Sequence, residues 1–267
     1  MAAKRDGVFI WITWLARVMA GEQNCEWATW FKAHHENYDK APSDFDTAKW
    51  NIEHTRQLRR LRLERRKLGE RVFLQGENAI RLTLPSGVVL AGKPDLITLP
   101  SGAVVADKPD LITPPDGPPA ALRLWRPTIY DVKTGRARCS DRIQVMLYMH
   151  LAPQALPAYA GTRPAGCVVY NGSKIDIPPE AVDQKFIEAF EYFLDVIAGS
   201  DPAWKVPSRH ECRFCDIAQT ECPERIEGLA VCRQAAQPAH GSEAEKSTGR
   251  LRALRRLRSQ RQRRKKA

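Results

Sequence analysis

The segment Ile129-Tyr130-Asp131-Val132-Lys133 places a carboxylate and an ammonium group two residues apart in a β-prone run. Alternate side chains of a strand point to the same face, so Asp131 and Lys133 are expected to share one face with Ile129. Burying two such charges costs free energy unless they pair with each other or bind a ligand. The pair is therefore a candidate site, although a surface strand could carry the same two residues.

Two further segments could complete such a site. Asp95 falls in a β-prone segment, residues 92–97, upstream of Asp131. Gln144 and Tyr148 are four residues apart where a helix is expected, so they lie on one helical face. Two converging carboxylates form a hard oxygen site suited to Mg²⁺ or Mn²⁺. A neighbouring lysine could orient a water molecule or neutralise charge that develops on a phosphate.

These segments occur in the order of a nuclease motif. Residues 92–97 read GKPDLI, residues 130–136 read YDVKTGR, and residues 144–148 read QVMLY. Over about residues 8–226 the chain resembles the PD-(D/E)xK nuclease superfamily, most closely its RecB-like nuclease domains. In that family an acidic residue on one strand precedes an acidic-x-Lys strand and a Gln-x-x-x-Tyr helix. His54 lies where the family often has a histidine on an earlier helix.

The resemblance implies a role for each matching residue. Two acidic residues and a backbone carbonyl hold the metal, a lysine acts at the attacking water, and a glutamine and a tyrosine contact the nucleic acid. In this chain the implied metal ligands are His54, Asp95, Asp131 and the Val132 carbonyl, the implied catalytic residues are Asp95, Asp131 and Lys133, and the implied substrate contacts are Gln144 and Tyr148. Taken alone, His54 fits equally well as a polar residue on a helix face.

A tandem repeat leaves the first carboxylate open between two aspartates. Residues 83–97 read TLPSGVVLAGKPDLI and residues 98–112 read TLPSGAVVADKPDLI, so Asp110 repeats Asp95. The Pro and Gly of each copy predict a turn, and the apolar residues after them predict a strand. Asp95 is favoured because a glycine precedes its Lys-Pro-Asp, where the family usually has a small residue. Asp110 is nearer to Asp131 in the sequence and stays the alternative.

Cysteines form a second candidate site. The chain has seven, an odd number in a chain too long to need disulfides, which favours a reducing compartment, the cytoplasm. Three of them fall within eleven residues, among prolines and polar residues, as in a loop that wraps a metal: Cys212, Cys215 and Cys222. A fourth ligand is needed, and the candidates are Cys25, Cys232 and, less well placed, His210.

The cysteine positions resemble those of RecB-like nucleases that contain an iron–sulfur cluster, among them a CRISPR-associated group and the AddB subunit type. Those proteins place one cysteine before the nuclease core and three after it. The resemblance implies a [4Fe–4S] cluster held by Cys25, Cys212, Cys215 and Cys222. Four thiolates also suit Zn²⁺, so the metal stays open. Cys139 and Cys167 are expected to be buried as small apolar residues.

The elements that must position these residues are predicted from periodicity. Helices are expected at 8–35, 47–68, 141–151 and 179–199, the second with a strongly basic composition. Strands are expected at 71–75, 79–84 and 128–133, with a hairpin of 166–171 and 174–177 around Asn171-Gly172. Helices around a mixed sheet predict an α/β (α+β layered) fold. The resemblance implies a restriction-endonuclease-like core with a C-terminal cysteine module.

The net charge of +11 comes from one end of the chain. Residues 246–267 contain eleven Lys and Arg and no acidic residue, and the remainder has 31 basic residues against 31 acidic ones. A terminal block of like charge is usually disordered and often contacts polyanions, although it can also bind nothing. Residues 1–232 are therefore expected to form the nuclease domain, and 233–267 a polar linker and disordered basic tail. No run of 18 apolar residues is present, so no membrane span is expected.

These features predict a metal-dependent DNA nuclease, an exonuclease on single strands or ends. Its expected partners are DNA and a helicase or another nucleic-acid-processing subunit. The alternative is a catalytically silent nucleic-acid-binding module that a cluster or zinc holds together within a larger complex, because a fold alone does not secure activity. The complete set of Asp95, Asp131, Lys133, Gln144 and Tyr148 favours the enzyme.

Overall fold

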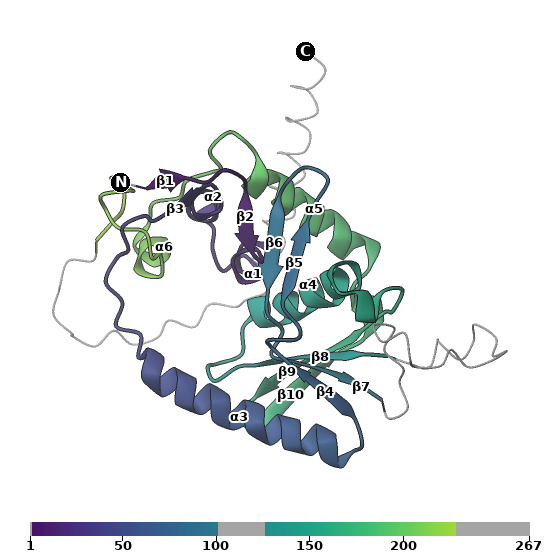
Figure 1. The fold of residues 1–267 in the computed structure, drawn as a ribbon. Helices are drawn as coiled ribbons and strands as arrows, with labels where there is room; N and C mark the ends of the chain where they lie inside the picture. Colours follow the sequence, from purple (N-terminus) through teal and green to yellow (C-terminus); the bar gives the residue numbers. More distant parts are fainter. Residues whose placement is uncertain (1, 101–125, 228–267) are drawn as a thin grey trace, which may run out of the picture. The chain divides into compact units, whose positions relative to one another are not determined.

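A five-stranded mixed sheet lies at the centre of the fold (Figure 1). The structure is a computed structural model that describes residues 2–100 and 126–227. The strand order is β10-β9-β8-β7-β4, in which β8 and β9 are parallel and the other neighbours antiparallel. The strands are β4 Arg71–Leu74, β7 Leu96–Leu99, β8 Thr128–Val132, β9 Ala165–Tyr170 and β10 Ser173–Ile177.

Two smaller sheets complete the strand content of the described residues. One has the order β2-β6-β5, with β2 parallel and β5 antiparallel to β6. Its strands are β2 Phe9–Trp11, β5 Ile80–Thr83 and β6 Val89–Gly92. The other pairs β1 Ala3–Lys4 with β3 His35–Glu36. Since β6 precedes β7 by only a few residues, the first copy of the repeat connects the two larger sheets.

Helices cover both faces of the central sheet (Figure 1). They are α1 Ile12–Met19, α2 Glu26–His34, α3 Thr47–Lys67, α4 Cys139–Ala155, α5 Gln184–Ala198 and α6 Arg209–Arg213. Short 3₁₀ turns lie at Pro157–Tyr159 and Pro179–Ala181. The predicted α/β class, with mixed sheets flanked by helices, is confirmed.

Strand alternation divides the buried residues between the two faces. Ile97 and Ile129 belong to the large core around α4, whereas Leu96 and Tyr130 form a smaller cluster with Leu61 of α3. Because alternate residues share a face, Asp131 lies on the α4 side, as Ile129 does. The site therefore faces α4, and α3 covers the opposite face.

The expected helix 8–35 is wrong in its extent. Residues 9–11 form β2, because they pair with β6 in the small sheet. The helical remainder is broken into α1 and α2, and Gly21 lies between them with φ 72°, a conformation that a helix does not use. This break leaves Cys25 in the loop that leads into α2.

Other predicted elements are confirmed with small shifts. The helix expected at 47–68 is α3, and Asp46 caps it by accepting a 2.8 Å hydrogen bond from the Lys49 N–H. The hairpin turns at Gly172, where φ is 88°. The helix expected at 179–199 begins later, as α5, after a 3₁₀ turn.

Some predictions fall outside the described residues: the second repeat copy with Asp110, Cys232, and the basic tail. The described residues, 2–100 and 126–227, belong to one structural unit. Of the helices described, none has the length and apolar character needed to cross a membrane.

Candidate active site

The register of β7 and β8 brings two carboxylates together. Leu96 is opposite Tyr130 and Ile97 is opposite Ile129, so the same register places Asp95 opposite Asp131. Both aspartates are buried, with 5% and 3% of their surface exposed. Two buried carboxylates side by side require partners for their charge, and these partners define the site.

Asp95 is held from three directions. Its Oδ2 accepts a 2.7 Å hydrogen bond from the Val132 N–H and lies 3.1 Å from Nε2 of His54, on α3. Its Oδ1 accepts a hydrogen bond from the side-chain amide of Gln75. The hydrogen bond to Asp95 raises the pKa of His54, in spite of the opposing effect of burial. His54, predicted as a further metal ligand, thus lies directly beside the first carboxylate.

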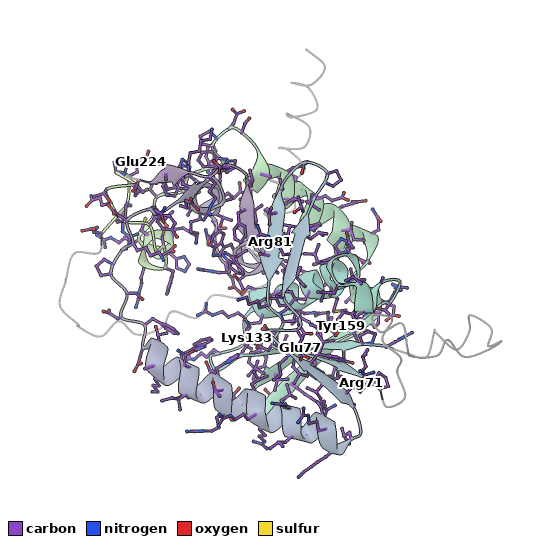
Figure 2. All side chains as sticks on the ribbon, viewed as in Figure 1. Arg71, Glu77, Arg81, Lys133, Tyr159 and Glu224 are labelled. Atoms are coloured by element: carbon purple, nitrogen blue, oxygen red, sulfur yellow. The ribbon has the colours of Figure 1, made fainter. Side chains whose placement is uncertain are left out.

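Asp131 forms a small ring of contacts with a lysine and a glutamine. Nζ of Lys133 lies 2.7 Å from Asp131 Oδ2 and donates a 2.9 Å hydrogen bond to Oε1 of Gln144. The Gln144 amide nitrogen in turn donates to Asp131 Oδ1 and to the Tyr148 hydroxyl, both at 3.1 Å. Figure 2 labels Lys133, which directly follows β8.

The electrostatics of this ring favour a charged lysine. Burial raises the pKa of Asp131, and the ammonium of Lys133 opposes that rise. Burial alone would lower the pKa of Lys133, but the nearby Asp131 outweighs it and the pKa is raised. The raised pKa of Lys133 favours its charged form in this arrangement.

Gln144 and Tyr148, which the resemblance implies as substrate contacts, are both buried, with 7% and 1% of their surface exposed. Gln144 contacts both Asp131 and Lys133, and the Tyr148 hydroxyl accepts a hydrogen bond from Gln144. Both residues line the same pocket as the two aspartates, and so does Val132. Their contact with a nucleic acid stays a prediction.

The carboxylates open into a pocket of about 500 Å³. Its lining includes four cationic side chains, Arg17, Lys93, Arg136 and Arg138. Nε of Arg17 is buried without a hydrogen-bond partner among the described residues. A pocket lined by both carboxylates and cationic side chains could receive a ligand that carries negative charge.

A metal ion at the carboxylates would need a small rearrangement. Within residues 2–100 and 126–227, no group of three or more His, Cys, Asp or Glu side chains stands ready to hold one. The donor types nevertheless fit, since Asp95, Asp131 and the Val132 carbonyl are hard oxygens. His54, whose Nε2 lies 3.1 Å from Asp95 Oδ2, could serve as a further ligand. Rotation of Lys133 away from Asp131 Oδ2 would free an oxygen for such an ion.

A steric constraint at Gly92 favours the first repeat copy, which contains Asp95. A Cβ atom added at Gly92 would lie 2.6 Å from Cε1 of Tyr148 and 2.7 Å from Cδ1 of Ile12, both in the core. The second copy has Asp107 at the equivalent position, and its side chain would not fit there. The geometry therefore agrees with the choice of Asp95.

The four predicted cysteine ligands line one cavity. Cys25 comes from the loop before α2, and Cys212, Cys215 and Cys222 come from α6 and the loop after it. Sγ of Cys25 accepts a hydrogen bond from the Val206 N–H, and Sγ of Cys212 accepts one from the Ile226 N–H, both at 3.4 Å. Burial raises the pKa of Cys25, Cys215 and Cys222, so these thiols stay protonated unless a cation binds them. Thiols with backbone N–H groups directed at sulfur are the ligand type of a soft metal or a cluster, but among the described residues these four do not form a ready metal site as they lie.

The remaining cysteines differ from each other. Cys167 is buried as expected, whereas Cys139 is exposed at the start of α4, which contradicts the expectation that it is buried. The first residue of that helix faces outward because the apolar face of α4 begins later, at Val145.

Glu211, which sequence reasoning did not predict as a functional residue, connects the two parts of the cysteine site. Its buried carboxylate accepts hydrogen bonds from the Asn24 N–H at 3.0 Å, the Asn24 side-chain amide at 2.8 Å and the Cys25 N–H at 3.2 Å. Figure 1 shows α6 beside α2, although about 180 residues separate Cys25 from Glu211. Glu211 thereby fixes the loop of Cys25 against the other three cysteines.

Comparison with known proteins does not assign the chain to a family. No family model and no curated protein matches the chain. Among solved structures, the crystal structure of SSO0001 matches with 13% sequence identity and a TM-score of 0.41, over 84% of this chain and 90% of that chain. A likeness this weak supports no conclusion about the present chain.

Replacing Glu211 by alanine should destabilise the protein by about 2–4 kcal/mol, because three donors lose a buried charged acceptor. Urea unfolding followed by circular dichroism would measure the change. Glu224→Ala is the matched control: its exposed ion pair with Lys205 should contribute less than about 1 kcal/mol. Equal effects of the two substitutions would contradict the assigned role of Glu211.

Proposed function

We propose that this protein is a metal-dependent nuclease of the RecB-like PD-(D/E)xK type, with a restriction-endonuclease-like core. The observation that carries the proposal is the pairing of Asp95 and Asp131 across β7 and β8, with Lys133 in contact with Asp131. The cationic lining of the same pocket supplies the charge that a polyanionic substrate needs. DNA, as a single strand or an end, is the proposed substrate.

Each residue of the site has a task in phosphodiester hydrolysis. A divalent ion, Mg²⁺ or Mn²⁺, held by Asp95, Asp131 and the Val132 carbonyl, would polarise the phosphate and lower the pKa of the attacking water. Lys133, kept charged by Asp131, would orient that water or stabilise negative charge on the phosphate. Gln144 fixes the position of Lys133, and His54 fixes Asp95 while standing close enough to serve as a further ligand.

The long helix α3 offers a surface for the rest of the substrate. Its exposed side chains include several arginines and a lysine, namely Arg56, Arg59, Arg60, Arg66 and Lys67. The same helix contributes His54 to the site. A strand that leaves the pocket along α3 would meet these cations, and its binding would weaken as salt increases.

One observation favours the alternative of a silent nucleic-acid-binding module. Among the described residues, no group of three or more His, Cys, Asp or Glu side chains is arranged to hold a metal ion. A module that lost its metal while keeping the basic α3 surface would still bind nucleic acid. Cleavage and binding must therefore be measured separately.

End-labelled single-stranded and duplex DNA should be degraded in the presence of Mg²⁺ or Mn²⁺ and left intact in EDTA. Lys133→Ala should lower the rate by at least about a hundredfold, because the charge beside the attacking water is lost. Gel analysis of the labelled products measures the rate and the polarity. Cleavage that survives Lys133→Ala would contradict the assigned site, and binding without any cleavage would support the silent module.

The two repeat copies provide an internal control. Asp95→Asn should abolish cleavage, whereas Asp110→Asn, in the second copy, should leave it intact. The reverse result would move the first carboxylate to the second copy.

We further propose that Cys25, Cys212, Cys215 and Cys222 hold a [4Fe–4S] cluster, with Zn²⁺ as the alternative. Protein purified without oxygen should contain about four iron and four sulfide per chain and absorb in the visible range. Cys25→Ala should lose the metal, whereas Cys139→Ala, at an exposed position, should retain it. One zinc and no iron per chain would exclude the cluster, and retention of iron in Cys25→Ala would exclude this fourth ligand.

A further inference from the structure

Two exposed aromatic side chains lie at the edge of the candidate active site. Phe45 has 62% of its surface exposed and Trp50 has 37%, and both line the pocket that contains Asp95 and Asp131. Two large aromatic side chains that line the same pocket form an exposed apolar patch, and such patches often mark a ligand-binding surface. Neither residue has a part in the proposed chemistry.

The two rings extend the site outward in a fixed order. The Trp50 ring stacks on His54, with ring centroids 4.9 Å apart and an angle of 25° between the planes. Phe45 follows, with its centroid 6.4 Å from that of Trp50. Since His54 contacts Asp95, the series Phe45, Trp50, His54 leads from solvent to the carboxylates.

Local structure keeps these rings in place. Trp50 and His54 are four residues apart on α3, so they lie on one face of a helix and stack along it. The Asp46 cap fixes the start of the same helix, directly after Phe45. The helix and the stacking on His54 restrict the Trp50 ring before any ligand binds, which lowers the entropy cost of binding.

The cations of the pocket show what kind of ligand the rings could receive. Arg17, Lys93 and Arg136 line the same pocket and suit phosphates. A ligand that offers flat aromatic surfaces together with regularly spaced negative charge is a nucleic-acid strand. Its bases are free to stack on protein rings only where they are unpaired, because in a duplex neighbouring base pairs cover both faces.

We propose that Phe45 and Trp50 form a stacking surface for unpaired bases next to the scissile phosphate, and that this surface selects single-stranded DNA. The inference rests on the proposed function, whose site it extends. The bases would stack on the rings while the phosphate of the same strand reaches the carboxylates.

The test measures binding in EDTA, so that cleavage cannot interfere. Fluorescence anisotropy would compare three labelled DNA probes: a single strand, the blunt duplex of the same sequence, and a single strand of abasic sites. Phe45→Ala and Trp50→Ala should each weaken binding of the single strand about tenfold. The duplex and the abasic strand, which offer no free base faces, should change less than about twofold.

Two further variants separate stacking from other effects. Trp50→Phe should restore most of the affinity for the single strand, whereas Trp50→Leu, apolar but without a ring, should behave like Trp50→Ala. Trp204→Ala is the matched control, because Trp204 is 74% exposed and does not line this pocket. Thermal unfolding of each variant checks that its fold is intact.

Loss of affinity for all three probes alike, or no loss for the single strand, would overturn the stacking surface. The wild-type protein could also cleave no DNA under any metal condition while the two substitutions still weaken binding of the single strand selectively. That result would support the stacking surface and contradict the proposed nuclease. The two failures are therefore distinguishable.

Discussion

The rest of the site depends on the antiparallel register between β7 and β8, which sets Asp95 opposite Asp131 within the protein. Two buried carboxylates at this distance repel each other, and the neighbouring Asp95 contributes to the raised pKa of Asp131. His54 contacts Asp95 on one side, and the ammonium of Lys133 contacts Asp131 on the other. A divalent cation would relieve the same repulsion, as the proposed function requires.

Three parts of the structure lie near this pair: α4, α3 and the cysteine module. The α4 side of the sheet carries Gln144, which positions Lys133, while α3 brings His54 over the edge of the sheet and continues as a basic surface. The cysteine module joins early and late segments of the chain through the hydrogen bond between Glu211 and the Cys25 N–H. Arg17 lines both the cysteine cavity and the active-site pocket, so the two sites are neighbours.

Local pattern and long-range contact explain what the sequence could and could not predict. The strand at 128–133 and the residues near Asp131 in the sequence could be predicted, because strand alternation and motif spacing are patterns of a few neighbouring residues. The expected helix 8–35 failed because its first residues pair with a distant strand, and because Gly21 adopts a positive φ. Glu211 was missed because its partners are about 187 residues away, and no local pattern encodes such a contact.

Calorimetric titration with Mn²⁺ tests the central claim most directly, because it measures the ligand site without requiring cleavage. At pH 7.5 the protein should bind Mn²⁺, and Asp131→Asn should lose this binding. At pH 5.5 the wild-type protein should bind more weakly, since the raised pKa values of Asp131 and His54 make protons compete with the metal at both ligands. Binding that is equally strong in Asp131→Asn, or no binding at pH 7.5, would contradict the claim that this pair of carboxylates is a metal site.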